Sequence, residues 1–174
     1  MKKLASFGVF TLILFLCSAW IIKPESGEEK KEAKIKWMTV EEAFAATQKK
    51  PKKIFIDVYT DWCGWCKKMD RDTFEKAEVA EYMNEHFYAV KFNAEQKEDI
   101  VLGDQTFKFI NQGRRGYHQL AAALMNGKMS YPTVVVLNEK FQMLQPIPGY
   151  RAPAEMKKVL EFFAQNKHLQ KKAE

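Results

Sequence analysis

The segment KIFIDVYTDWCGWCKKMD, residues 53–70, decides the fold that we expect for this chain. Its first part, Lys53–Asp61, is a short run of β-branched and aromatic residues with mostly apolar side chains on both faces. Such a run is typical of a central strand that helices cover on each side. A pair of cysteines, Cys63 and Cys66, follows at once, and a helix is expected from about residue 63 to residue 75. The pair therefore lies where a strand gives way to a helix.

Zinc binding is the first use that two cysteines at this spacing suggest. A structural zinc site takes four Cys or His ligands, usually as two spaced pairs. This chain has three cysteines and no second pair. Three histidines are scattered along the chain, and we expect each to be an ordinary surface or half-buried residue: His86, His118 and His168. We therefore expect no metal site.

A purely structural disulfide between Cys63 and Cys66 stays open as a second interpretation. It would close a very short loop, and a disulfide stabilises a protein less when the loop that it closes is small. The local geometry is also tight, and strained disulfides are the more easily reduced ones. Both arguments favour a pair that opens and closes during a reaction.

The position of Cys63 favours a thiolate. Unpaired backbone N–H groups and the positive end of the helix dipole stabilise an anion at a helix start. Lys67 and Lys68 add positive charge nearby. Cysteines in such motifs often have pKa values lowered to roughly 3.5–7.5, which makes the sulfur nucleophilic near neutral pH. Cys66, one turn further on, could attack a mixed disulfide formed at Cys63, and the pair thus predicts two-step thiol–disulfide exchange.

Two charged residues interrupt apolar strands. Asp57 lies six residues before Cys63, where a buried carboxylate is costly without a partner. Lys91 is equally out of place within the predicted strand FYAVKFN, Phe87–Asn93. If the two strands are neighbours, Asp57 and Lys91 pair beneath the disulfide, and Asp57 could take the proton from Cys66 as it attacks. The alternative is that each side chain reaches water at a strand edge.

The remaining elements follow from capping residues and periodicity. Thr39-Val40-Glu41-Glu42 has the form of a capping box, and the amphipathic helix that it opens is expected to end near Pro51. Ser130-Tyr131-Pro132-Thr133 places a proline directly before a β-branched strand, where a cis peptide would make a tight turn. The other expected elements are a helix over 77–85, a helix over 117–126 with Gly127 as its C-cap, two strands around a turn at 138–140, and a last helix from Pro153.

The pattern is weakest between residues 95 and 116, where TFKFI predicts a short strand and NQGRRG predicts a loop. Apart from this segment, the order of elements is α, β, α, β, α, β, β, α around one sheet. The first unit is β-α-β with a right-handed crossover. The sequence therefore predicts an α/β fold with one central sheet.

The N-terminus resembles an export signal. Lys2 and Lys3 precede the uncharged run 4–22, and Cys17-Ser18-Ala19 supplies small residues at the spacing of a cleavage site. The run is also long enough for an uncleaved membrane anchor, and a lipid-modified Cys17 is a third alternative. We expect a signal peptide or anchor over 1–22, a charged linker over 23–36, one domain over 37–167 and a polar tail over 168–174.

The net charge argues against a nucleic-acid partner. The formal charge of +6 falls to +4 without the two lysines of the leader. The only tight basic cluster is Arg114-Arg115, whereas a nucleic-acid groove needs a longer basic stripe interleaved with aromatic residues. We therefore expect no binding of nucleic acid.

Taken together, these motifs resemble the thioredoxin superfamily. WCGWCK, Asp57, Lys91, Tyr131-Pro132-Thr133 and Gly149 occur in the order seen in thioredoxin-fold proteins, over roughly residues 35–166. The chain is most similar to exported bacterial thioredoxin-like proteins with a WCxWCK motif, which are similar in turn to the thiol-carrying domain of periplasmic transmembrane reductases. This resemblance implies a thioredoxin fold, with a central mixed β-sheet flanked by helices.

The resemblance also implies roles for single residues. Cys63 would be the attacking cysteine and Cys66 the resolving one, with Asp57 and Lys91 as the proton-handling pair. The two tryptophans and the glycine between them would bind the substrate: Trp62, Gly64 and Trp65. Pro132 would be a cis-proline that faces the disulfide, and Tyr131 would lie beside the bound substrate. From the residues alone, both tryptophans could equally be packing residues, although two at one helix start suggest partial exposure.

Two departures from the family pattern matter. The residues between the cysteines are Gly64-Trp65, whereas ordinary thioredoxins have Gly-Pro. This pair influences the redox potential, so reduction, isomerisation and oxidation of substrates all stay open. The stretch before the cis-proline strand is about twenty residues longer than in a minimal thioredoxin. The insertion is expected over 103–116, either as a solvated loop or as a docking loop through Arg114, Arg115 and Tyr117.

We therefore expect an exported thiol–disulfide oxidoreductase that reduces protein or peptide disulfides. It would work in the periplasm or elsewhere outside the cytosol, and an uncleaved leader would tether it to the membrane by its N-terminus. Its redox-active Cys63–Cys66 disulfide is the only redox group expected, without a further cofactor, and a membrane thiol reductase is the expected electron donor. The chain is expected to be a monomer. The alternatives are a disulfide isomerase or oxidase, or a non-catalytic chaperone or binding module built on the same fold.

Overall fold

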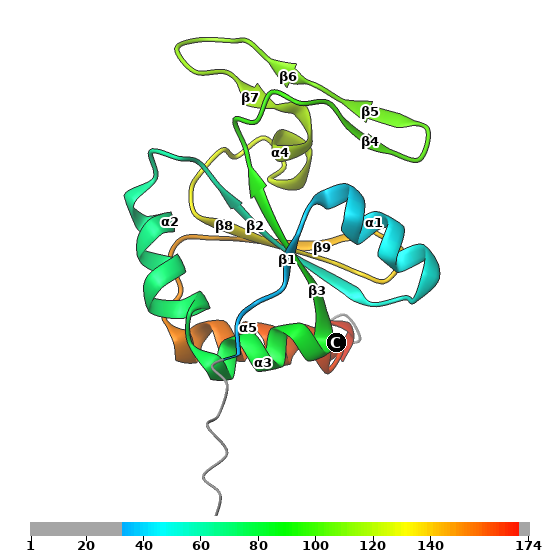
Figure 1. Ribbon diagram of the computed structural model, residues 1–174, viewed down its shortest axis with the longest axis vertical. Coiled ribbons are helices and arrows are strands. Elements are labelled where there is room, and N and C mark those ends of the chain that lie inside the picture. Colours follow the sequence, from blue (N-terminus) through cyan, green and yellow to red (C-terminus); the bar gives the residue numbers. More distant parts are fainter. Residues whose placement is uncertain (1–32, 171–174) are drawn as a thin grey trace, which may run out of the picture.

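A computed structural model describes residues 33–170, and its centre is a five-stranded mixed sheet (Figure 1). The strands lie in the order β1-β3-β2-β8-β9. Their bounds are β1 Trp37–Met38, β2 Lys53–Tyr59, β3 Phe87–Asn93, β8 Thr133–Leu137 and β9 Met143–Pro148. β1, β2 and β3 are parallel, whereas β8 is antiparallel to β2 and β9. The predicted α/β fold with a mixed central sheet is confirmed.

β2 is the central strand, and its side chains alternate between two cores. Ile54, Ile56 and Val58 belong to one buried cluster, and Phe55 belongs to the other. This alternation is the period of two that a strand imposes. Asp57 is therefore on the same face as Phe55. In the parallel pairing of β2 with β3, Asp57 lies directly opposite Lys91.

Helices cover both faces of the sheet (Figure 1). α1 and α4 pack against the face that carries Ile54 and Ile56. α2, its continuation η1, α3 and α5 pack against the face that carries Phe55. The helices are α1 Val40–Lys49, α2 Gly64–Met69, the π-helical turn η1 Asp70–Phe74, α3 Ala77–His86, α4 Gln119–Leu124, α5 Pro153–Ala164 and α6 Lys167–Gln170.

α1 begins with the predicted capping box. The Thr39 hydroxyl accepts the Glu42 N–H at 3.1 Å, and the Glu42 carboxylate accepts the Thr39 N–H at 2.8 Å. Two orphan N–H groups of the helix start are satisfied in this way. Val40 and Ala43 then face the core, which holds α1 against the sheet.

The insertion forms two hairpins instead of the expected short strand and loop. β4 Ile100–Leu102 pairs with β5 Gln105–Phe107, and β6 Phe109–Ile110 pairs with β7 Tyr117–His118. The extra structure thus covers 100–118, whereas the sequence suggested 103–116. The expected helix over 117–126 is correspondingly shorter, because its first two residues pair with β6 and α4 begins at Gln119.

His118 is not the surface or half-buried residue that the sequence suggested, because its side chain is fully buried. Its Nδ1 accepts the N–H of Leu120 at 3.2 Å and caps α4, and its Nε2 donates to the carbonyl of Glu98 at 3.2 Å. One ring nitrogen thus accepts and the other donates, as in a neutral imidazole. Burial lowers the pKa of His118, which favours the same form. His86 and His168 are half-buried as expected.

The folded part begins earlier than the expected linker boundary at residue 36. Ile35 is buried, and the side-chain amide of Asn84 donates to the Lys34 carbonyl and accepts the Lys36 N–H. These contacts lead the chain into β1, an edge strand that we did not predict. At the other end, the short helix α6 occupies residues 167–170, where a polar tail was expected from residue 168. The predicted leader, residues 1–22, lies outside the described residues. Within the described range, no helix has the length and apolar character needed to cross a bilayer.

Candidate redox-active site

Cys63 and Cys66 form a disulfide at the start of α2, with Cα atoms 5.3 Å apart. Cys63 is the N-cap residue, and its Sγ accepts the backbone N–H of Cys66 at 3.0 Å. An N–H group that would otherwise lack a partner therefore points at the sulfur of Cys63. The same donor and the helix dipole would stabilise a thiolate there once the disulfide is reduced.

The lysines that follow the motif differ in their surroundings. Lys67 is exposed on α2. Lys68 forms an ion pair with Asp72 and lies 5.5 Å from the ring centre of Tyr150. Because Asp72 already balances its charge, Lys68 adds less positive potential at Cys63 than the sequence suggested.

The expected pair beneath α2 is present. Asp57 is fully buried, and the Nζ of Lys91 donates to its Oδ2 at 2.5 Å. The same Nζ also donates to a carboxylate oxygen of Asp70, which the sequence analysis missed. Asp70 follows Cys66 by four residues, and this spacing places two residues on one face of a helix. That spacing is the signal in the sequence that could have identified Asp70.

Burial and charge act against each other on Asp57. Burial raises the pKa of its carboxyl to about 6, although the nearby Lys91 ammonium acts in the opposite direction. Its other oxygen, Oδ1, has no hydrogen-bond partner among residues 33–170. A carboxyl group with a pKa near 6 can gain and lose a proton close to neutral pH, which is what a proton acceptor needs.

Lys91 remains charged in this setting. Burial acts to lower the pKa of Lys91, but Asp57 and Asp70 outweigh it and leave the pKa above its usual value. The ammonium also lies 4.9 Å from the ring centre of Tyr59 and 5.3 Å from that of Trp37. Aromatic rings at this distance stabilise a cation.

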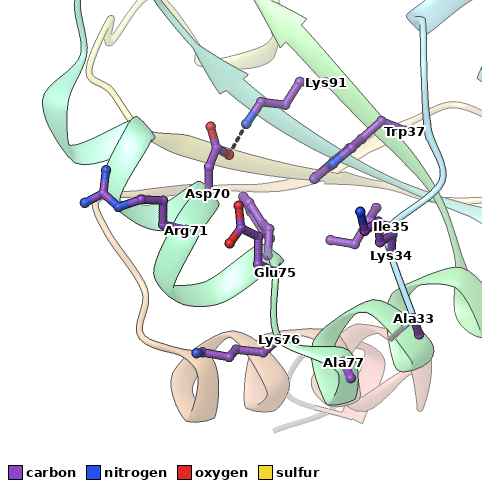
Figure 2. A pocket seen from close by; sticks show the side chains of 11 residues that line it. Ala33, Lys34, Ile35, Trp37, Asp70, Arg71, Glu75, Lys76, Ala77 and Lys91 are labelled. Carbon is purple, nitrogen blue, oxygen red and sulfur yellow. Dashed lines mark hydrogen bonds and ion pairs between the residues drawn. The ribbon is translucent and has the colours of Figure 1, made fainter. Parts of the chain in front are cut away.

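The Asp70–Lys91 pair borders a pocket of about 720 Å³ (Figure 2). The wall opposite the pair comes from the chain segment before β1, with Trp37 beside Lys91. Arg71, Glu75 and Lys76 give the pocket a mixed charge. Asp57 itself does not line the pocket, so Lys91 and Asp70 stand between the buried carboxylate and this open space.

The two tryptophans of the motif are exposed, as expected. Trp62 retains 51% and Trp65 retains 59% of full exposure. The Trp62 ring lies edge-on to Tyr131 at 5.9 Å, and the Trp65 ring lies 5.6 Å from Tyr150. Aromatic side chains next to both cysteines thus form an exposed apolar rim at this end of the molecule.

Two further predicted substrate residues lie at this rim. The Tyr131–Pro132 peptide bond is cis, and the Pro132 carbonyl accepts the N–H of Gly149 at 2.8 Å. Gly64 is exposed, and no atom lies within 4 Å of the position that a Cβ would take. The backbone between the cysteines is therefore open to a second chain.

Two residues at the rim were not predicted as part of the site. The guanidinium of Arg115 lies 4.4 Å from the ring centre of Trp62, and the carboxylate of Glu95 accepts the Trp62 indole N–H at 2.9 Å. Arg115 comes from the turn between β6 and β7 and Glu95 from the turn after β3. Among residues 33–170, no group of three or more His, Cys, Asp or Glu side chains is placed to hold a metal ion.

One protein-family model matches most of the chain. It is Thioredox_DsbH, described as "Protein of unknown function, DUF255", and it matches residues 27–171. A family of this kind and the close cysteine pair support a thiol–disulfide function in general.

The curated relatives are much longer proteins. An uncharacterized protein of Caenorhabditis elegans is 30% identical over 77 residues, which are 44% of this chain and 11% of that protein. Spermatogenesis-associated protein 20 of Homo sapiens is 33% identical over 67 residues, which are 38% of this chain and 8% of that protein. The match thus spans about a tenth of the length of these relatives.

Similar solved structures are thioredoxin folds. A DsbH oxidoreductase is 18% identical, with a TM-score of 0.55 over 76% of this chain and 86% of that one. A thioredoxin from Thermus thermophilus is 17% identical, with a TM-score of 0.56 over 74% and 86%. A putative disulphide-isomerase from Bacteroides thetaiotaomicron is 24% identical, with a TM-score of 0.52 over 76% and 94%. These likenesses show that the described chain has a thioredoxin fold.

Proposed function

Because the chain belongs to the Thioredox_DsbH family of the thioredoxin superfamily, we propose that it is a thiol–disulfide oxidoreductase that reduces disulfides in proteins or peptides. The observation that carries this proposal is the placement of Cys63 at the N-cap of α2, with its partner one turn away and a buried Asp57, paired with Lys91, on the α2 side of the sheet. A structural bridge needs neither the helix start nor the buried acid.

The first step is attack by Cys63. Its thiolate bonds to one sulfur of the substrate disulfide, and the other substrate sulfur leaves as a thiolate and takes up a proton. The Cys66 N–H that points at Cys63 Sγ supports this assignment, because it stabilises negative charge on that sulfur. The exposed rings of Trp62 and Trp65 give the substrate chain a surface to lie on.

The second step is attack by Cys66 on the Sγ of Cys63. The Cys66 thiol gives its proton to Asp57, the Cys63–Cys66 disulfide forms, and the second substrate sulfur leaves as a thiolate and takes up a proton from water. Two electrons have then passed to the substrate, its two thiols carry protons from solvent, and the Cys66 proton is on Asp57. The full burial of Asp57 and its pKa of about 6 support this role, because the carboxylate can accept a proton near neutral pH.

The proton must afterwards leave a buried carboxyl group. Lys91 donates hydrogen bonds to both Asp57 and Asp70. The three side chains therefore form a continuous series from Asp57 through Lys91 to Asp70, which borders the pocket of Figure 2. Lys91 thus holds the charge of Asp57 in place, and Asp70 connects the pair to solvent. These contacts assign Asp70 a positioning role in the proposed mechanism.

A reduced partner protein must restore the dithiol. In this proposal the donor is a membrane thiol reductase, and the protein acts outside the cytosol as a monomer. The support for export is the uncharged run 4–22 after two lysines. The Cys63–Cys66 pair carries the electrons by itself, without a metal, flavin or nucleotide.

Reduction of insulin by dithiothreitol tests the proposal. We expect catalysis by the wild type and none by Cys63→Ser, because the attacking sulfur is gone. Cys17→Ser is the matched control, since it removes the third cysteine of the chain and should leave the rate unchanged. Equal turnover by Cys63→Ser and the wild type would refute the proposal and favour a non-catalytic binding module.

The roles of the two sulfurs have a separate test. Cys66→Ser should accumulate mixed disulfides with client proteins, because Cys63 attacks and nothing resolves the product, while Cys63→Ser should trap none. Recovery of clients chiefly on Cys66 would reverse the roles. Equilibration with glutathione buffers tests the direction, and a potential near about −120 mV, as in a strong oxidant, would contradict a reductase.

A further inference from the structure

The turn between β6 and β7 reaches the end of the sheet that carries the disulfide (Figure 1). There Arg115 lies with its guanidinium 4.4 Å from the ring centre of Trp62, the residue before Cys63. The insertion therefore contributes a cation beside Trp62, whose neighbour in the chain is the redox-active Cys63. A solvated loop without a role does not require such a contact.

The conformation of this turn is closely determined. Gly116 has φ +72°, and a Cβ there would lie 2.4 Å from the Cζ of Phe109 and 2.5 Å from the carbonyl oxygen of Ile110. Its N–H donates to the carbonyl of Gln112 at 3.1 Å. A side chain at this position would displace β6, so the turn requires glycine to take this course, in which Arg115 lies over Trp62.

The guanidinium of Arg115 has no hydrogen-bond acceptor among residues 33–170, and no carboxylate of these residues lies within ion-pair distance of it. Glu95 also contacts Trp62, but its carboxylate accepts the indole N–H at the edge of the ring. Trp62 thus holds Glu95 at its edge and Arg115 on its face. A guanidinium held in this way presents a planar set of donors that matches a carboxylate.

Two of the other cations near the site are already paired, whereas Lys67 is exposed on α2 and contacts no aromatic ring among residues 33–170. Lys68 forms an ion pair with Asp72, and Lys91 forms ion pairs with Asp57 and Asp70. Arg115 differs from both because its charge is exposed and uncompensated within the described structure.

We propose that Arg115 is a specificity residue that binds a carboxylate of the substrate polypeptide beside the disulfide being reduced. This inference rests on the proposed function and adds the class of substrate, namely disulfides flanked by Asp or Glu. Trp62 adjoins Cys63 in the chain, so a group bound over its ring lies within a few residues of the substrate sulfur that Cys63 attacks. A bidentate bond to the carboxylate would fix the orientation of that chain.

Two peptide disulfides of identical sequence, with either Glu or Gln beside the cysteine, provide the test. For the wild type, the acidic peptide should have a kcat/KM about three- to tenfold above that of the amide peptide, the range expected for an exposed hydrogen-bonded charge pair. Arg115→Gln should make the two values equal. Arg114→Ala, which removes an equally exposed arginine without a ring contact, should keep the preference.

The outcomes separate the two proposals. If the wild type reduces neither peptide, the proposed function fails. If the wild type reduces both at one rate, and Arg115→Gln does the same, the reductase stands and the specificity role is refuted. The preference of the wild type should also decline between about 0.05 and 1 M salt, because the Debye length shortens from over 10 Å to about 3 Å. A preference that survives in Arg115→Gln, with unchanged thermal unfolding, would likewise refute the role of Arg115.

Discussion

Replacement of Asp57 by Asn should stabilise the oxidised protein at neutral pH, and the gain should grow as the pH rises. Asp57 is fully buried, and burial raises its pKa to about 6 despite the Lys91 ammonium, so the neutral carboxyl group is favoured more in the folded state than in the unfolded chain. The amide of Asn keeps an oxygen that can accept a bond from Lys91 and never ionises. The variant therefore avoids the cost of a buried charge.

The magnitude follows from proton linkage. The carboxyl group titrates near pH 3.8 in the unfolded chain and near pH 6 in the folded one, so the folded state binds more protons between these values. The free energy of unfolding of the wild type therefore falls as the pH rises through this window. The gap of about 2.2 between the two pKa values corresponds to about 3 kcal/mol in the free energy of unfolding. The wild type has lost nearly all of this stability by pH 7, but less than about 1 kcal/mol at pH 4.

Urea unfolding of the oxidised proteins at pH 4, 5, 6 and 7 measures this effect. The free energy of unfolding of Asp57→Asn minus that of the wild type should increase by roughly 2 kcal/mol from pH 4 to pH 7. Asp72→Asn is the control, because its exposed carboxylate has a pKa lowered by the bond to Lys68. A lowered pKa contributes stability above the unfolded value, so the difference for this variant should change in the opposite direction.

A difference that stays flat from pH 4 to pH 7 would refute the reasoning, because it would mean that Lys91 compensates fully for the burial of Asp57. A difference that decreases with pH would mean that the folded state lowers the pKa of Asp57. In either case the carboxylate would be too weak a base near neutral pH to accept the Cys66 proton in the proposed second step.

Further variants test the surroundings of the site. Asp70→Asn should lower the pKa of Asp57, because the negative charge of Asp70 raises it. The acid limb of the pH–rate profile should therefore move to lower pH. An unmoved limb would contradict the electrostatic effect of Asp70 on Asp57. Gly116→Ala should lower the free energy of unfolding in urea by about 2–4 kcal/mol, because of the left-handed backbone and the clash with Phe109. Gly113→Ala, where φ is +70° and the space is open, should lower it by only about 1 kcal/mol. Equal losses would contradict the role of close packing. Asn84→Ala should cost about 1–3 kcal/mol, because it removes two hydrogen bonds that hold the chain before β1, and hydrogen exchange of the Lys36 amide should rise; unchanged exchange would contradict this.

The sequence predicts the part of the site that is formed by charged residues within apolar strands. Asp57 and Lys91 are recognisable because each interrupts an apolar strand, where an unpaired charge is costly. Parallel neighbouring strands of a β-α-β unit then bring the two side chains opposite each other. The fold follows from the same logic, since a buried strand, a helix start and a second strand leave few arrangements.

The rest depends on contacts between distant segments. β1 has two residues, too few to show an alternating pattern, and its pairing with β3 comes from tertiary structure. β6 and β7 are as short, and polar residues surround them. The contact of Arg115 with Trp62 joins residues 53 positions apart, and nothing local marks either as a partner of the other. The sequence predicts His118 within a helix, whereas it is the last residue of β7 and caps α4 from that strand.

The parallel pairing of β1 with β3 has a consequence for how this domain could be joined to other structures. β3 runs toward the disulfide, where Asn93 bonds to Asp61, so residues 33–36 lie at the far end of the sheet, where Asn84 bonds to Lys34. The last helix, α6, also lies at that far end (Figure 1). A fusion or a surface attached at that far end would therefore leave the exposed rings of Trp62 and Trp65 at the disulfide end uncovered, so that large folded clients could approach them.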